Sequence, residues 1–156
     1  MSIKYVSGDI FLNQNHVQAF AHGCNCKGVM GAGIAVRFKN EYPEMFNEYQ
    51  RRCKASPRQF NVGDAFLWKE KDKPFVFNLG TQESPGHRAT YQAIEKSLSN
   101  MVGQTDIEEI KSIAIPRIGS GYGGLEWEKV RAVIEKEFER WSGNLFVYEE
   151  YKPETK

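Results

Sequence analysis

The stretch His22–Ala35, HGCNCKGVMGAGIA, decides the fold because it joins two kinds of structure. The apolar run Val17–Gly23, VQAFAHG, leads into it and is typical of a buried strand, and Gly33–Asn40 continues it as a helix. The glycines between them place bare backbone N–H groups at a helix N-terminus, where anions bind. The stretch therefore predicts a strand, an anion-binding loop and a helix in succession.

The rest of the chain repeats this alternation of short apolar runs and longer amphipathic stretches. Further strands are expected at IKYVSGD (3–9), DAFLWKE (64–70), FVFNLGT (75–81), SIAIPRI (112–118) and LFVYEEY (145–151). Further helices are expected at Pro43–Lys54, Thr90–Val102 and Trp127–Trp141. The pattern predicts an α/β fold with three layers, α/β/α, around a mixed, mostly parallel central sheet. Ligands of such folds bind outside the carboxyl ends of the strands.

Length, charge and cysteine content limit the number of domains, the classes of binding partner and the cellular compartment that the sequence allows. A chain of 156 residues fits one domain, which we expect over residues 1–150, with a polar tail over 151–156. The net charge of +1 gives no general attraction to nucleic acid or membrane. Without a long apolar run, we expect neither a signal peptide nor a spanning helix, and a cytoplasmic location. Three cysteines do not suggest a disulfide framework.

A second glycine-rich loop, Ile118–Trp127, IGSGYGGLEW, also follows an apolar strand and opens a helix. Glycine lets phosphate oxygens approach the backbone and permits a positive φ. Neither loop matches a Walker or a dinucleotide-binding motif. Two such loops at equivalent positions predict a diphosphate site; the alternative is that the glycines only serve tight turns.

Three ordered motifs carry a resemblance to a known family. GDIF (Gly8–Phe11), HGCNCKGVMGAGIAVRFK (His22–Lys39) and IPRIGSGYGGLEW (Ile115–Trp127) resemble the macro domains, which bind ADP-ribose. The branch that is most similar contains terminal ADP-ribose glycohydrolases, DNA-ADP-ribosylation antitoxins and a fungal ADP-ribose-1''-phosphate phosphatase. The resemblance covers nearly the whole chain.

The resemblance implies a set of ligand-binding residues. Asp9 would accept from the adenine amino group with help from the backbone of Ile10, Asn25 would contact the distal ribose, and Tyr122 and Tyr148 would cover ribose or base. The first loop would lie along the proximal phosphate and distal ribose through Gly28, Val29, Met30, Gly31, Ala32, Gly33, Ile34 and Ala35. The second would enclose the diphosphate through Pro116, Ile118, Gly119, Ser120, Gly121, Tyr122 and Gly123.

The sequence departs from the family pattern at its catalytic positions. Members that remove ADP-ribose from glutamate carry a nucleophilic lysine where this chain has Gln82, and an aspartate where it has Gly123. His22, which resembles the phosphatase, is the candidate for proton transfer, with Asn25 beside it. The alternative is a hydrogen-bonded structural histidine. Glu83 and Glu126 are the nearest acidic side chains in sequence.

Two functions from different classes remain open at this point. The chain hydrolyses an ADP-ribose derivative, either an ADP-ribosylated acidic side chain or nucleobase or ADP-ribose-1''-phosphate, or it is a binding module for ADP-ribose without turnover. The partner is ADP-ribose or an ADP-ribosylated substrate in both cases, and no cofactor is expected. Cys24 and Cys26 have poor spacing for zinc, so we expect no metal. A thiol nucleophile and small buried cysteines are both compatible with the pattern. The sequence leaves the oligomeric state open.

Overall fold

The computed structural model describes residues 2–121 and 123–154. One six-stranded sheet has the strand order β1-β6-β5-β2-β4-β3. All neighbouring strands are parallel except β3, which is antiparallel to β4 at one edge. The strands are β1 (Ser2–Gly8), β2 (Ala19–Asn25), β3 (Ala65–Trp68), β4 (Phe75–Gln82), β5 (Ser112–Pro116) and β6 (Asn144–Tyr151). The predicted mixed, mostly parallel sheet is confirmed.

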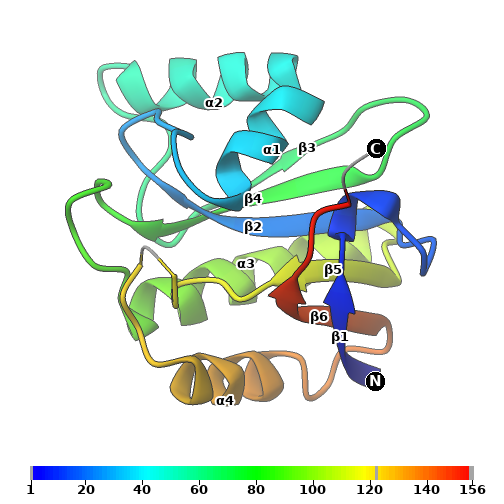
Figure 1. Ribbon diagram of the computed structural model, residues 1–156. Coiled ribbons are helices and arrows are strands. Elements are labelled where there is room, and N and C mark those ends of the chain that lie inside the picture. The colour runs from blue at the N-terminus through cyan, green and yellow to red at the C-terminus, as the bar shows by residue number, and fades with distance from the viewer. Residues whose placement is uncertain (1, 122, 155–156) are drawn as a thin grey trace.

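Helices cover both faces of this sheet (Figure 1). The helices are α1 (Ile34–Glu41), α2 (Pro43–Lys54), α3 (Tyr91–Glu108) and α4 (Trp127–Glu137), with a short 3-10 helix η1 (Ile10–Leu12) after β1. The first two lie on one face, and α3 and α4 lie on the other. The three-layer α/β/α arrangement is therefore confirmed.

The two faces hold separate hydrophobic clusters. Below the sheet in Figure 1, α3 and α4 pack Leu98, Met101 and Ile134 against β4, β5 and β6. Above it, α1 and α2 pack Phe38 and Tyr49 against β2. Because both faces are buried, the strands in the middle of the sheet consist mostly of apolar residues, as their sequences indicate.

The ends of α3 and α4 differ most from the predicted ones. Helix α3 continues beyond Val102 to Glu108 and ends where Glu109 adopts a left-handed conformation. Helix α4 stops at Glu137 instead of Trp141, and the Trp141 ring packs edge-on against Phe138, with 5.3 Å between ring centroids. Strand β6 includes Tyr151, so regular structure reaches one residue into the segment expected to be a polar tail.

The topology brings the two glycine loops together. β2 and β5 are neighbours in the sheet, so their carboxyl ends lie at the same edge. The chain leaves β2 toward α1 on one face and leaves β5 toward α4 on the other (Figure 1). This divergence is the switch point at which open α/β sheets bind ligands.

None of the helices in residues 2–121 and 123–154 is long and apolar enough to cross a lipid bilayer. The cytoplasmic location stays a prediction of the sequence.

Candidate functional site

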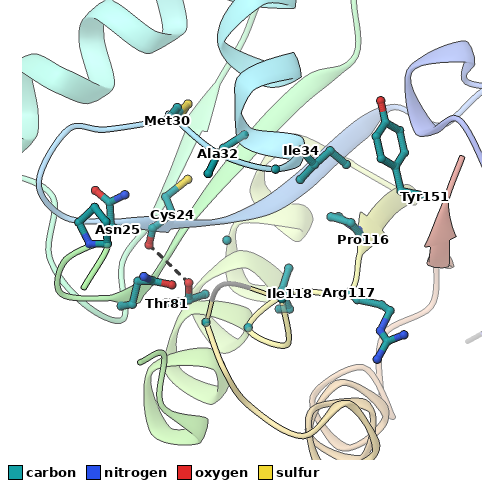
Figure 2. Close-up of a pocket in the computed structure, with 18 of the residues that line it drawn as sticks. Cys24, Asn25, Met30, Ala32, Ile34, Thr81, Pro116, Arg117, Ile118 and Tyr151 are labelled. Carbon is teal, nitrogen blue, oxygen red and sulfur yellow. Dashed lines mark hydrogen bonds between the residues drawn. The ribbon is translucent and has the colours of Figure 1, made fainter. Parts of the chain in front are cut away.

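A cavity of about 580 Å³ lies at the carboxyl ends of β2 and β5, between the two glycine loops (Figure 2). This volume is in the usual range for ligand pockets, about 300–1,000 Å³. Many residues predicted to bind ligand line it: Asn25, Val29, Met30, Gly31, Ala32, Gly33, Ile34, Ala35, Pro116, Ile118, Gly119, Gly121, Gly123 and Tyr148. The structure thus brings both loops to one cavity, and their contact with a ligand stays a prediction.

Some of the predicted residues do not line this cavity. Asp9, Ile10, His22, Gly28 and Ser120 lie outside its wall. Asp9 and Ile10 are buried at the start of η1, where Asp9 is the N-cap and accepts from the backbone N–H of Phe11. Tyr122 falls outside the described residues.

Glycines fix the backbone of the first loop, and a hydrogen bond from α2 anchors it on the side away from the cavity. Gly28 has a φ of +82° and its carbonyl accepts from Nε2 of Gln50, 3.1 Å away. Gly33 is the N-cap of α1 with a φ of +62°, and no side chain caps that helix end. A β-carbon on Gly31 would meet only a Val29 methyl carbon at 3.5 Å. The loop therefore offers an uncapped helix end at Gly33 and free space beside the backbone at Gly31.

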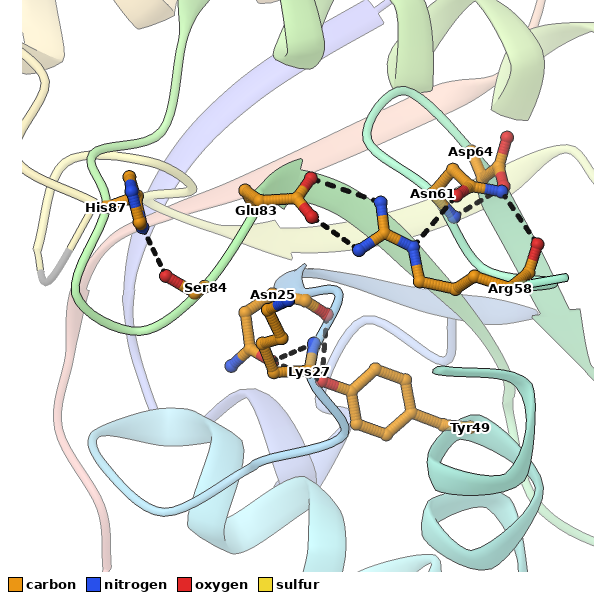
Figure 3. Close-up of polar contacts among 9 residues, drawn as sticks. All are labelled: Asn25, Lys27, Tyr49, Arg58, Asn61, Asp64, Glu83, Ser84 and His87. Atoms are coloured by element: carbon orange, nitrogen blue, oxygen red, sulfur yellow. Dashed lines mark hydrogen bonds and ion pairs between the residues drawn. The ribbon is translucent and has the colours of Figure 1, made fainter. Parts of the chain in front are cut away.

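Asn25 closes the turn at the base of this loop (Figure 3). Its Oδ1 accepts from the Lys27 backbone N–H at 3.0 Å and from the Tyr49 hydroxyl at 3.0 Å. Its Nδ2 donates to the Val29 carbonyl at 2.7 Å. An amide carries two N–H donors, so one hydrogen of Nδ2 remains for a ligand.

The second loop is packed against itself and against α3. Gly119 has a φ of +73°, and a β-carbon there would lie 2.5 Å from Cδ1 of Ile94. A β-carbon on Gly123 would lie 2.6 Å from the Gly119 carbonyl oxygen, a backbone atom. The aspartate that some family members carry at this position therefore does not fit the present backbone.

His22 lies in the core and not in the cavity wall, which favours the alternative of a structural histidine, and its catalytic role stays a prediction. Its side chain is fully buried and its ring stacks on Phe38 with 3.9 Å between centroids. Nε2 is 2.7 Å from Oδ1 of Asn78, whose Nδ2 donates to the Phe66 carbonyl. Burial lowers the pKa of His22 to about 4, so the ring is neutral near pH 7.

The cysteines are free, buried thiols. Cys24 lines the cavity, where its sulfur points toward the side of Met30 and Ala32 (Figure 2). Burial raises the pKa of Cys24 and raises that of Cys26 to about 12, so both remain protonated. Among the described residues, no group of three or more His, Cys, Asp or Glu side chains is placed to hold a metal ion.

The end of β4 and the segment after it form a third wall of the cavity. Thr81 and Gln82 line the cavity from the strand end and Pro85 lines it from the following segment, and of these the sequence singled out only Gln82. Nε2 of Gln82 donates to the carbonyls of Ser84 at 2.9 Å and His87 at 3.2 Å. Thr81 and Gln82 end β4, which is parallel to its neighbour β2. The carboxyl ends of parallel neighbours lie at the same edge of a sheet, and this rule could have indicated the third wall from the sequence.

Glu83 holds this segment in place instead of facing the cavity. Its carboxylate pairs with the Arg58 guanidinium, and its carbonyl accepts from the Cys26 backbone N–H at 3.2 Å (Figure 3). The pairing with Arg58 holds the pKa of Glu83 below its usual value. Glu126, the other acidic candidate, is exposed and pairs with Lys129.

The cavity is nearly neutral. Among its described lining residues, only Arg117 and Glu149 carry a charge. The Arg117 guanidinium lies 5.2 Å from the Trp127 ring centroid, and Glu149 accepts from Nε1 of the same indole at 2.8 Å. Gly23, Cys24 and Tyr151 are further lining residues that the sequence did not indicate.

The comparisons with known proteins agree with this geometry. A family model described as Macro domain matches residues 21–134. The chain belongs to the Macro domain family. The macrodomain of Mycobacterium tuberculosis DarG superposes on it with a TM-score of 0.84 and 30% identity, covering 97% of this chain and 98% of that one.

This macro domain matches nearly the whole length of one curated relative and less than half of another. Human ADP-ribose glycohydrolase OARD1 is 32% identical over 149 residues, which cover 94% of this chain and 90% of the human protein. A DNA ADP-ribosyl glycohydrolase from Thermus aquaticus is 28% identical over 151 residues, or 94% of this chain. The chain spans 41% of the length of that bacterial relative.

Proposed function

We propose that this macro domain binds ADP-ribose in the cavity and hydrolyses an ADP-ribose derivative at the distal ribose. The observation that carries the proposal is the pair of glycine loops that face each other across a cavity of about 580 Å³. The names of the relatives support the substrate class, because both are glycohydrolases that act on ADP-ribose or ADP-ribosylated DNA.

The diphosphate would lie between the two loops. The uncapped N-terminus of α1 offers backbone N–H groups and the positive end of a helix dipole. The space beside Gly31 leaves room for phosphate oxygens to approach the backbone. Binding of the negatively charged diphosphate would thus depend on the backbone N–H groups of the loops, since few charged side chains line the cavity.

The distal ribose would lie near Asn25, Thr81 and Gln82, where the described wall has no carboxylate or imidazole. Without a lysine or a thiolate, hydrolysis would proceed without a covalent enzyme intermediate. A water oxygen attacks the anomeric carbon, and the bond from that carbon to the leaving atom breaks. The proton lost by water passes through a phosphate oxygen of the ligand to the leaving atom, and the free Nδ2 hydrogen of Asn25 orients a ribose hydroxyl.

A binding module without turnover is the second candidate function. The observation that favours it is the neutral wall at the Asn25 end, because His22 is buried and Glu83 is paired with Arg58. Such a protein would hold ADP-ribose attached to another molecule and release nothing.

Calorimetry and product analysis on the same sample distinguish these candidates. We expect one ADP-ribose to bind per chain, and ADP-ribose to be released from an ADP-ribosylated glutamate peptide or an ADP-ribosylated DNA oligonucleotide. Phosphate release from ADP-ribose-1''-phosphate is tested in parallel. Binding without any product supports the second candidate, and the absence of heat with millimolar ADP-ribose contradicts both.

A further inference from the structure

Residues 83–90 connect β4 to α3 and are hydrogen-bonded to both glycine loops. At one end, the Cys26 backbone N–H, at the start of the first loop, donates to the Glu83 carbonyl at 3.2 Å. At the other end, the Ala89 backbone N–H donates to the Gly123 carbonyl of the second loop at 2.9 Å. We call residues 83–90 the bridging segment, because they link one loop to the other.

An ion pair outside the cavity wall fixes the first end of this segment. The Glu83 carboxylate accepts from both terminal nitrogens of Arg58, Nη1 to Oε1 and Nη2 to Oε2, the second at 3.1 Å (Figure 3). Nε of Arg58 donates to Oδ1 of Asn61 at 2.9 Å, and Nδ2 of Asn61 donates to the Arg58 carbonyl at 3.2 Å. The guanidinium is therefore oriented by its own loop, with its other two nitrogens toward Glu83.

The two ends of the bridging segment are held by different means. At the second-loop end, Ala89 is buried, and Thr90 caps α3 by accepting from the Ala93 backbone N–H at 3.0 Å. At the first-loop end, the Glu83 side chain is 44% exposed, so burial contributes less there. The pair with Arg58 is therefore the contact on which the first-loop end depends most.

We propose that Arg58 is a positioning residue: through Glu83 it fixes the bridging segment against the first loop and so sets the shape of the cavity before a ligand enters. Arg58 lies outside the described cavity wall, whereas Pro85 of the bridging segment lines it. A bidentate pair fixes orientation as well as distance, and a cavity formed in advance binds its ligand more tightly. The inference rests on the proposed binding of ADP-ribose.

A double-mutant cycle on ligand affinity tests this role. Calorimetry gives the Kd of ADP-ribose for wild-type protein, Arg58→Met, Glu83→Gln and the variant with both changes. We expect each single change to weaken binding by roughly three- to tenfold. The double variant should lose no more than either single variant, because both changes remove the same pair.

Arg51→Met is the matched control. It removes another bidentate pair, in which Arg51 contacts Glu48 at 2.7 and 2.9 Å within α2, and it should keep the wild-type Kd. Amide hydrogen exchange supplies a readout that overall stability does not move. In Arg58→Met and Glu83→Gln, the Cys26 N–H should exchange faster relative to the Ala89 N–H, which marks the other end of the bridging segment.

The outcomes separate this inference from the proposed function. A wild-type Kd in both single variants, additive losses in the double variant, or an unchanged ratio of the two exchange rates overturns the inference and leaves the proposed function standing. Wild-type protein that does not bind ADP-ribose removes both. If Arg58→Met does not fold, Arg58→Lys, which keeps the charge but not the bidentate fork, replaces it in the cycle.

Discussion

The two glycine loops look alike in sequence but differ in what surrounds them. In the first loop, a β-carbon on Gly31 would have open space except for one contact of 3.5 Å. In the second, a β-carbon on Gly123 would lie 2.6 Å from a backbone oxygen. Glycine at position 31 therefore leaves open space beside the backbone, whereas glycine at position 123 is required by the fold. The difference teaches that a glycine motif can serve two separate physical needs.

A single methyl group placed in each loop tests this contrast most strongly. Gly123→Ala forces the backbone of the second loop apart, so we expect the free energy of unfolding to fall by roughly 2–4 kcal/mol. Gly31→Ala, the matched control, should change it by no more than about 0.5 kcal/mol. Urea unfolding measures both. Equal stability of the two variants would remove the distinction between the loops.

The buried His22 side chain makes the stability of the protein depend on pH, which gives a second test of the packing around the first loop. The pKa of His22 is about 4 in the folded protein, below its value near 6.5 in the unfolded chain. The unfolded state therefore binds the proton first, so stability falls as the pH drops from about 6.5 to 4 and is unaffected above that window. The loss is about 3 kcal/mol in total.

Denaturant unfolding at several pH values measures this loss, with His22→Gln as the comparison. The variant cannot be protonated in this range, so its stability should have a smaller pH dependence. A wild-type curve that is flat between pH 6.5 and 4 would show that the imidazole is accessible to water.

A carboxylate in the first loop tests its role in binding. Gly31→Glu places a charge and a side chain in the space predicted for phosphate, so we expect the affinity for ADP-ribose to fall at least about a hundredfold. Calorimetry measures this change. Gly103→Glu is the control, because it adds the same charge on α3, where a β-carbon meets nothing within 4 Å. If Gly31→Glu keeps wild-type affinity, the ligand lies elsewhere.

The smallest expected effect concerns the turn that shapes the first loop. Asn25→Ala removes the bonds to Lys27 and Val29, so we expect the affinity for ADP-ribose to fall about tenfold. Asn40→Ala, at an exposed position on α1, should leave it unchanged. Titration of both variants with ADP-ribose makes the comparison. A Kd for Asn25→Ala equal to that of wild type would show that the turn does not depend on this side chain.

The sequence predicted the parts of the fold that depend on local pattern. Strand–loop–helix units follow from apolar runs and glycines, so β2 and α1 were found within two residues of their bounds. The end of α3 was missed because Gly103 and Thr105 are weak helix formers. Tertiary contacts compensate: Thr105 is buried and its hydroxyl accepts from Nε1 of Trp141 at 3.0 Å.

Long-range packing decided what the sequence could not predict about the site. Nothing next to His22 in the chain indicates that the Phe38 ring covers it, and nothing near Asp9 indicates that Glu154 donates to it. Glu149 was missed because a charged residue in an edge-proximal strand usually faces water. Its position becomes visible only when β6 packs beside α4 and the Trp127 indole reaches its carboxylate.

Amide chemical shifts recorded during a titration with ADP-ribose test the binding site most directly. A two-dimensional nitrogen–proton NMR spectrum reports each backbone N–H group separately, including those of both glycine loops. Saturable shifts in the first loop, at the N-terminus of α1 and in the second loop are the predicted result. Shifts confined to other parts of the chain, or none at millimolar ligand, would contradict the proposal that the cavity between the loops binds ADP-ribose.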